Sequence, residues 1–227
     1  MTSHGSPTTV PGRTRATARW FRPAAYAAPV FVKVCGLREP EHVAAAVDAG
    51  ADAIGFVLTD SPRRVDAART RQLAEEVPQH VLTVGVFAGE SPDEVRAAVR
   101  DSGVRAVQLH GSHPRSDFAA LRVLPVRLVR AVSDDGHNDL RCGAYDEDLL
   151  LIDAPRAGSG QPWDWAALGD RPSGSWLLAG GLTPDNVDAA VTVARPWGVD
   201  VSSGVEVRRG VKDSALIRDF VAAARRL

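Results

Sequence analysis

A lysine and a cysteine lie two residues apart at the end of an apolar segment, in the stretch Val-Phe-Val-Lys-Val-Cys-Gly-Leu that starts at Val30. Residues two apart on a β-strand project to the same face, so we expect Lys33 and Cys35 to lie side by side. A neighbouring cation favours the thiolate, the form of cysteine that acts as a base or a nucleophile. The alternative is that Cys35 packs as a small, unreactive apolar side chain.

Two carboxylates also occur at the ends of apolar segments. Asp153 follows Leu149-Leu150-Leu151-Ile152, and Asp200 lies within Gly198–Val201. Partial burial of Asp153 would raise its pKa and allow it to act as a general acid. The alternative is that Asp153 caps the following loop. Asp200 is expected either to bind a substrate or to neutralise a nearby cation.

Further polar side chains follow two other apolar segments. Gln108 and His110 are two residues apart and share a face, and His110, nearer the end, is the better candidate for contact with a substrate. Arg63 and Arg64 follow Ala53–Leu58. A guanidinium group suits a planar carboxylate, so either arginine could hold one.

Three clusters of glycine and serine follow apolar segments in the second half of the chain. Glycines allow backbone N–H groups to approach an anion closely, and such loops hold phosphate groups in many barrels. Any one cluster could be an ordinary turn. Together they predict a phosphorylated small-molecule ligand. The residues are Gly158, Ser159 and Gly160; Gly180 and Gly181; and Ser202, Ser203 and Gly204.

The elements that must position these residues form a regular alternation. Eight strand-like segments alternate with segments of helical periodicity, which predicts an α/β fold with parallel strands. Eight such units in one chain predict a single closed (β/α)8 TIM barrel. An open doubly wound sheet is the alternative, although no G-x-G-x-x-G follows the first strand. The predicted strands are Val30–Cys35, Ala53–Leu58, Val81–Phe87, Ala106–Leu109, Val126–Ala131, Leu149–Asp153, Trp176–Ala179 and Gly198–Val201.

Local signals predict some helix boundaries. Ser91-Pro92 and Thr183-Pro184 each place proline at the first position of a helix. The last helix is expected within Ser214–Leu227, with an apolar face. Cys142 lies in a stretch of helical character, where we expect a structural role.

The composition excludes several classes of function. The chain has 227 residues, 44% of them hydrophobic, and a formal net charge of −1, so no basic field indicates nucleic acid. No apolar run reaches the roughly 18 residues needed to cross a membrane. Two cysteines are too few for a disulfide framework and suggest the cytoplasm. No spacing of histidines suggests a metal site. No helix face is unusually apolar, so we expect a monomer.

Residues 1–29 differ from the rest of the chain. They are rich in Ser, Thr, Pro, Ala and Arg, and they contain no acidic residue. They include no continuous apolar segment of the kind found in a secretory signal. We therefore expect a flexible N-terminal extension at 1–29 and a catalytic barrel domain at 30–227.

The ordered set of segments from about Val32 to Phe220 resembles the phosphoribosylanthranilate isomerase family of tryptophan biosynthesis. Each segment alone is a weak signal, but their order is specific. The segments are Lys33–Leu37, Gly50–Phe56, Ser61–Arg63, Val84–Phe87, Val107–Gly111, Gly158–Gly160 with Asp164-Trp165, Ala179–Val187, Val199–Glu206 and Lys212-Asp213.

The resemblance implies an eight-fold β/α barrel and an Amadori rearrangement of N-(5-phosphoribosyl)anthranilate that needs no cofactor. Cys35 would be the general base and Asp153 the general acid. Arg63 would hold the anthranilate carboxylate. The remaining implied roles concern binding: Lys33, His110 and Asp200 would line the substrate pocket, and the three clusters of glycine and serine would hold the phosphate.

Three alternatives remain open. The histidine-pathway isomerase runs the same rearrangement on the same fold, but it is expected to carry an aspartate where this chain has Cys35. A related enzyme acting on a different aromatic amine would need the same acid and base. A barrel that binds phosphate without catalysis is disfavoured by the presence of both Cys35 and Asp153.

Overall fold

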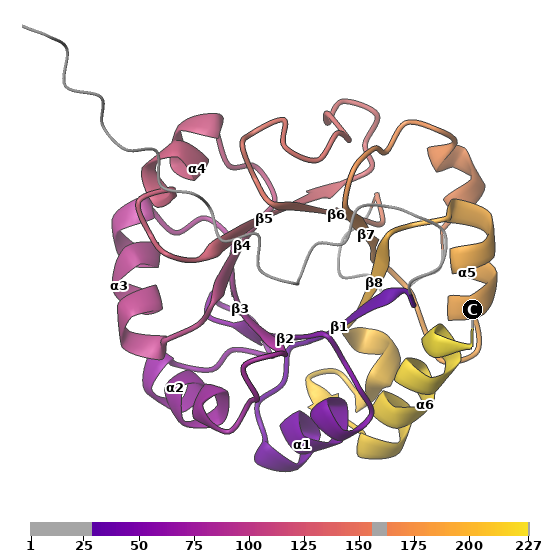
Figure 1. The fold of residues 1–227 in the computed structure, drawn as a ribbon, viewed down its shortest axis with the longest axis horizontal. Coiled ribbons are helices and arrows are strands. Elements are labelled where there is room, and N and C mark those ends of the chain that lie inside the picture. The colour runs from indigo at the N-terminus through magenta and orange to yellow at the C-terminus, as the bar shows by residue number, and fades with distance from the viewer. Residues whose placement is uncertain (1–28, 156–162, 227) are drawn as a thin grey trace, which may run out of the picture.

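A closed barrel of eight parallel strands forms the centre of the molecule (Figure 1). The computed structural model describes residues 29–155 and 163–226. Each strand pairs with the next along the chain, and β8 pairs with β1 to close the barrel. The strands are β1 (Phe31–Cys35), β2 (Ala53–Val57), β3 (Leu82–Phe87), β4 (Ala106–His110), β5 (Arg127–Ser133), β6 (Leu149–Asp153), β7 (Trp176–Leu178) and β8 (Gly198–Val201).

The strand prediction is confirmed. All eight strands occur where expected, with ends shifted by at most two residues, and the sheet closes instead of staying open. Most strand residues are buried because side chains fill the barrel on one face and helices cover the other. Every second side chain of a strand therefore points into the barrel, and on β1 these include Lys33 and Cys35.

Helices surround the barrel on the outside (Figure 1). They are α1 (Pro40–Asp48), α2 (Ala67–Glu75), α3 (Pro92–Ser102), α4 (Arg115–Leu121), α5 (Val187–Ala194), α6 (Ser214–Arg225) and the short 3₁₀ helices η1 (Trp165–Leu168) and η2 (Ser203–Val205). Among the helices of residues 29–155 and 163–226, none is long and apolar enough to cross a membrane.

Two predictions about helices are wrong and two are confirmed. The last helix, α6, forms within Ser214–Leu227 and buries an apolar face. Ser91 caps α3 through a reciprocal pair of bonds with Glu94, and Pro92 is the first helical residue, as expected. The helix after β7 begins at Val187 instead of Pro184, because the Asn186 side chain closes a turn by bonding Thr183 N (2.8 Å) and Gly181 O (2.9 Å). The segment around Cys142 forms turns, since it is rich in glycine and aspartate.

The strand that carries Lys33 and Cys35 is anchored at the opposite end of the barrel. Asp52 accepts a bond from Val32 N (2.8 Å) and pairs with Arg225 of α6 (2.6 Å). Arg225 also donates to the carbonyls of Val30 and Gly50. These contacts fix β1 between the first and last helices of the barrel. The expected extension at 1–29 lies outside the described residues except for its last position.

A short hairpin that the sequence analysis did not predict lies between η2 and α6. It consists of β9 (Glu206–Arg208) and the antiparallel β10 (Val211–Lys212), joined through Gly210. The turn packs on the loop after β2, because a Cβ atom on Gly210 would lie 2.9 Å from Pro62 O. The hairpin therefore borders the same end of the barrel as Arg63.

Candidate active site

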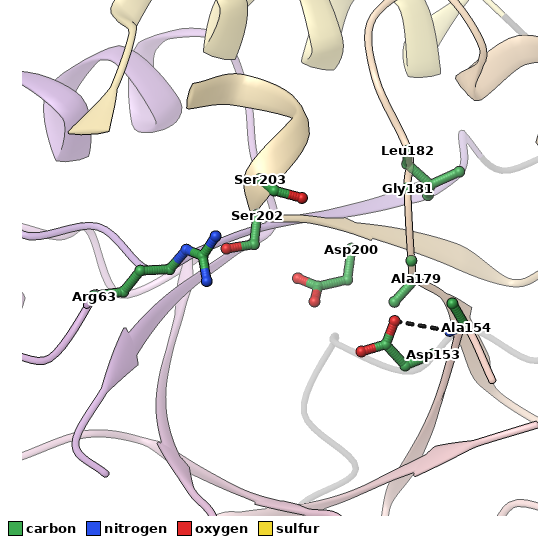
Figure 2. Close-up of a pocket in the computed structure, with 10 residues that line it drawn as sticks. Arg63, Asp153, Ala154, Ala179, Gly181, Leu182, Asp200, Ser202 and Ser203 are labelled. Atoms are coloured by element: carbon green, nitrogen blue, oxygen red, sulfur yellow. Dashed lines mark hydrogen bonds between the residues drawn. The ribbon is translucent and has the colours of Figure 1, made fainter. Parts of the chain in front are cut away.

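A cavity opens at the C-terminal end of the strands, where parallel barrels carry their chemistry (Figure 2). Figure 2 shows Asp153 and Asp200 projecting toward the same space, with Arg63 and Ser202 across from Asp153. The lining residues are Arg63, Asp153, Ala154, Ala179, Gly180, Gly181, Leu182, Asp200, Ser202 and Ser203. Half of the site residues predicted from the sequence thus line one cavity: Arg63, Asp153, Gly180, Gly181, Asp200, Ser202 and Ser203.

Lys33 and Asp200 form a buried ion pair on neighbouring strands inside the barrel. Lys33 Nζ lies 2.8 Å from Asp200 Oδ1, and the two side chains are 1% and 9% exposed. The pairing of β1 with β8 sets Lys33 directly opposite Asp200. Of the two roles considered for Asp200, the structure shows the neutralisation of a cation. The charge pair raises the pKa of Lys33, in spite of its burial.

Cys35 lies above Lys33 on the same face of β1, and its thiol packs over a glycine. A Cβ atom on Gly55 would lie only 2.7 Å from Cys35 Sγ, so the bare backbone of β2 makes room for the sulfur. Burial raises the pKa of Cys35, while Lys33 and Lys212 lower it and Asp200 raises it further. Lys33 thus acts in the expected direction, toward the thiolate, but burial of the thiol outweighs the nearby cations and the net pKa of Cys35 is raised.

Asp153 ends β6 on the other side of the cavity. Its Oδ1 accepts a bond from Ala154 N at 2.8 Å, and its Oδ2 lies 3.9 Å from His110 Nε2. Burial raises the pKa of Asp153, and Asp200 raises it further, whereas His110 lowers it. The direction agrees with the sequence analysis, and it favours the protonated form that an acid needs.

Gly180 is packed against Asp153 in a conformation that favours glycine. Its φ is +85°, and a Cβ atom there would lie 2.7 Å from Asp153 Oδ1 and 2.6 Å from Ala154 N. We expect Gly180→Ala to lower kcat/KM by about 10²-fold, because the methyl group displaces the Asp153 carboxyl from its position. Steady-state kinetics of the two proteins measure this effect.

The control for this variant is Gly103→Ala at the C-terminus of α3. Gly103 also has a positive φ, +71°, but a Cβ atom there meets nothing within 4 Å. Both variants carry similar backbone strain, so both are expected to lose some thermal stability. A loss of activity equal in the two would show that crowding at Asp153 has no effect.

Arg63 does not stand free in the cavity. Its Nε and Nη2 bond the two carboxylate oxygens of Glu206 at 2.7 and 3.0 Å. Lys212 Nζ bonds the same carboxylate at 2.8 Å. These contacts lower the pKa of Glu206 to about 2. The sequence analysis assigned no role to Glu206 or Lys212; their position after the serine and glycine cluster of β8 is the signal that could have found them.

The loops after β7 and β8 touch each other backbone to backbone. A Cβ atom on Gly204 would overlap Leu182 O, so only glycine fits there. Gly204 thus allows the two loops to pack together, and these loops place Gly180, Gly181, Ser202 and Ser203 in the lining of the cavity. Gly158, Ser159 and Gly160 lie outside the described residues.

Comparisons with known proteins agree on one family. Residues 32–223 match the sequence profile described as N-(5'phosphoribosyl)anthranilate (PRA) isomerase. N-(5'-phosphoribosyl)anthranilate isomerase of Chromohalobacter salexigens is 42% identical, covering 84% of this chain and 92% of its own length. The enzyme of the same name from Symbiobacterium thermophilum is 41% identical, with 86% and 98% covered.

Solved structures give the same result. TrpF from Jonesia denitrificans is 48% identical with a TM-score of 0.80, covering 86% of this chain and 97% of its own. A phosphoribosyl anthranilate isomerase in complex with reduced 1-(o-carboxyphenylamino)-1-deoxyribulose 5-phosphate is 34% identical with a TM-score of 0.77, covering 87% and 100%.

Proposed function

The chain belongs to the N-(5'-phosphoribosyl)anthranilate isomerase family, and we propose that Cys35 and Asp153 act as its base and its acid. The reaction is the Amadori rearrangement of N-(5-phosphoribosyl)anthranilate to 1-(2-carboxyphenylamino)-1-deoxyribulose 5-phosphate in tryptophan biosynthesis. The family match confirms the reaction expected from the sequence.

The rearrangement moves protons at two separate atoms of the sugar. Asp153 donates a proton to the furanose ring oxygen as the C1–O bond breaks, and the nitrogen lone pair forms a C1–N iminium. The thiolate of Cys35 then removes the proton from C2, and the electron pair forms the C1–C2 double bond of an enolamine. Loss of the C2 hydroxyl proton and protonation of C1 give the ketone. Each of the two catalysts is typically worth about 10²- to 10⁴-fold.

The observation that carries this proposal is the placement of the two groups at the same end of the barrel, with Asp153 lining the cavity and Cys35 packed at the end of β1. Cys35 ends β1 and Asp153 ends β6, and β7 and β8 lie between these strands in the barrel. The groups therefore approach a sugar from different sides. An isomerase assay with freshly prepared substrate tests the proposal by comparing the wild type with Cys35→Ser and Asp153→Asn.

We propose that Arg63 binds the carboxylate of the anthranilate ring. Glu206 occupies the Nε/Nη2 edge of the guanidinium, which leaves the Nη1/Nη2 edge for a second carboxylate. The phosphate would contact the backbone of Gly180, Gly181 and Ser203, supported by Gly204, and Gly158, Ser159 and Gly160 stay predicted phosphate ligands from the sequence. Asp200 and His110 would contribute polar surface to the pocket, and Lys33 would support Asp200 through their ion pair.

We expect Arg63→Ala to raise KM about 100-fold for the natural substrate, because it removes a charged bidentate contact. The same variant should barely change the kinetics of N-(5-phosphoribosyl)aniline, a substrate without the carboxylate. Arg64→Ala is the control, since Arg64 is exposed next to Arg63. If Arg63→Ala weakens both substrates equally, the carboxylate is bound elsewhere.

The oligomeric state and cellular location stay predictions. We propose a cytoplasmic monomer that binds a small phosphorylated substrate and neither nucleic acid nor a membrane. Cys35 and Cys142 are both free thiols, which suits a reducing compartment.

A further inference from the structure

The Glu206 carboxylate is the centre of a buried network at the mouth of the barrel. It accepts bonds from Arg63 Nε (2.7 Å), Arg63 Nη2 (3.0 Å), Lys212 Nζ (2.8 Å) and Gly210 N (3.0 Å). The side chains of Glu206 and Lys212 are 4% and 2% exposed. Burying a charge costs free energy unless the charge is paired. The four hydrogen bonds therefore favour a single arrangement of the Glu206, Arg63 and Lys212 side chains.

The charges of this network do not balance. One carboxylate faces two cations, Arg63 and Lys212, beside the cavity. A partly buried site with an excess positive charge favours an anionic ligand. The end-on edge of Arg63 is the part of this network that can receive the anion, because Glu206 already occupies the other edge.

The rest of the network leaves Arg63 little freedom. Gly36 has φ +80°, and a Cβ atom there would lie 2.8 Å from Arg63 Cδ, so the stem of Arg63 passes directly over a bare backbone. Lys212 Nζ also donates to Ser202 O (2.8 Å) and Ser202 Oγ (3.2 Å). Since Ser202 Oγ accepts from Lys212, its own proton is left to donate elsewhere, and Ser202 lines the cavity.

We propose that Glu206 is a positioning residue of this isomerase: it holds the side-on edge of Arg63 and thereby aims the end-on edge at the substrate carboxylate. The inference rests on the proposed role of Arg63 and adds a residue that acts through it. The hairpin β9–β10 is then part of the substrate-binding machinery, because it carries both Glu206 and Lys212 to the loop after β2.

The competing explanation is that Glu206 only stabilises the hairpin. The two explanations differ in how the substrate carboxylate affects the rate. A positioning role predicts that loss of Glu206 reduces the preference for the natural substrate over N-(5-phosphoribosyl)aniline. A structural role alone predicts equal losses on both substrates.

The test compares kcat and KM on these two substrates for the wild type, Glu206→Gln and Glu206→Asp. We expect Glu206→Gln to raise KM for the natural substrate about 10- to 100-fold, because Arg63 loses its charged partner. Its kcat and its kinetics on the aniline substrate should stay close to wild type. The double variant Arg63→Ala/Glu206→Gln should be no worse than Arg63→Ala on the natural substrate.

The control is Glu147→Gln, which removes the carboxylate of another buried ion pair. Glu147 lies 2.8 Å from Arg130, and its side chain is fully buried before β6, at the end of the barrel away from the cavity. It should lower the thermal stability without changing the preference between the substrates. Glu206→Asp serves if Glu206→Gln does not fold: one methylene shorter, it loses part of the bidentate contact and should show an intermediate preference.

If a folded Glu206→Gln or Glu206→Asp protein keeps the wild-type preference for the natural substrate over N-(5-phosphoribosyl)aniline, the positioning role is wrong. If Arg63→Ala abolishes the preference in the same experiment, the proposed carboxylate site stands while the role of Glu206 fails. If Arg63→Ala keeps the preference, the proposed carboxylate site itself is wrong, and the role of Glu206 falls with it.

Discussion

Cys35→Ser is expected to lower kcat about 10²- to 10⁴-fold, with the binding of the reduced product analogue little changed. Serine nearly matches cysteine in shape and fits above Gly55, but its hydroxyl is a far weaker acid than a thiol. The variant therefore lacks a base that can take the proton from C2. Turnover of N-(5-phosphoribosyl)anthranilate and titration with reduced 1-(o-carboxyphenylamino)-1-deoxyribulose 5-phosphate measure the two quantities separately.

Cys142→Ser is the matched control for this experiment. Cys142 is also a partly buried thiol whose pKa is raised by burial, to about 11, but it lies in the turns before β6. Its replacement should leave kcat unchanged. A Cys35→Ser protein that keeps the wild-type kcat would show that another group removes the C2 proton.

The pH dependence of the residual activity of Cys35→Ser gives a second test of the role of Cys35 as the base. Burial raises the pKa of both Cys35 and Asp153 from ordinary values of 9.0 and 3.8. Near neutral pH we therefore expect a protonated thiol, so the thiolate that acts as the base is a minor form, while burial shifts Asp153 toward the protonated form that acts as the acid. Without the thiol, kcat/KM depends on protonated Asp153 alone and should fall as pH rises through the pKa of Asp153.

Asp153→Asn is the second large effect, with an expected loss in kcat of about 10²- to 10⁴-fold. The amide oxygen can still accept the bond from Ala154 N, which is 2.8 Å from Asp153 Oδ1. The side chain is nearly the same size, but it has no acidic proton to give to the ring oxygen. The same isomerase assay measures the loss, and circular dichroism checks that the fold is intact.

The pH dependence of Asp153→Asn should run in the opposite direction from that of Cys35→Ser. With no acid to protonate, kcat/KM should rise with pH as the thiolate of Cys35 forms. Asp148→Asn is the control, because Asp148 is a buried structural carboxylate that bonds Leu128 N at 2.8 Å before β6. That variant should lose stability and keep its kcat. An Asp153→Asn protein with wild-type kcat would assign the acid to another group.

The barrel and the identity of its strand-end residues could be predicted from local patterns in the sequence. Strand periodicity and the alternation of strands with helices are local patterns, and they place Cys35 and Asp153 at strand ends whatever the rest of the chain does. The same logic predicted that Lys33 shares a face with Cys35. Local signals were weaker at Thr183-Pro184, where a turn closed by Asn186 delays the start of the helix, and around Cys142, where turns form in place of a helix.

The charge states of these residues and the contacts that hold them depend on the folded barrel. Burial and Asp200 raise the pKa of Cys35, whereas Lys33 and Lys212 lower it. The sizes of these opposing effects depend on the folded positions of the groups and cannot be taken from a sequence pattern. The bond from Arg63 to Glu206 joins residues 143 positions apart. It exists because closure of the barrel brings the loop after β2 against the hairpin after β8, and such a contact has no local signature.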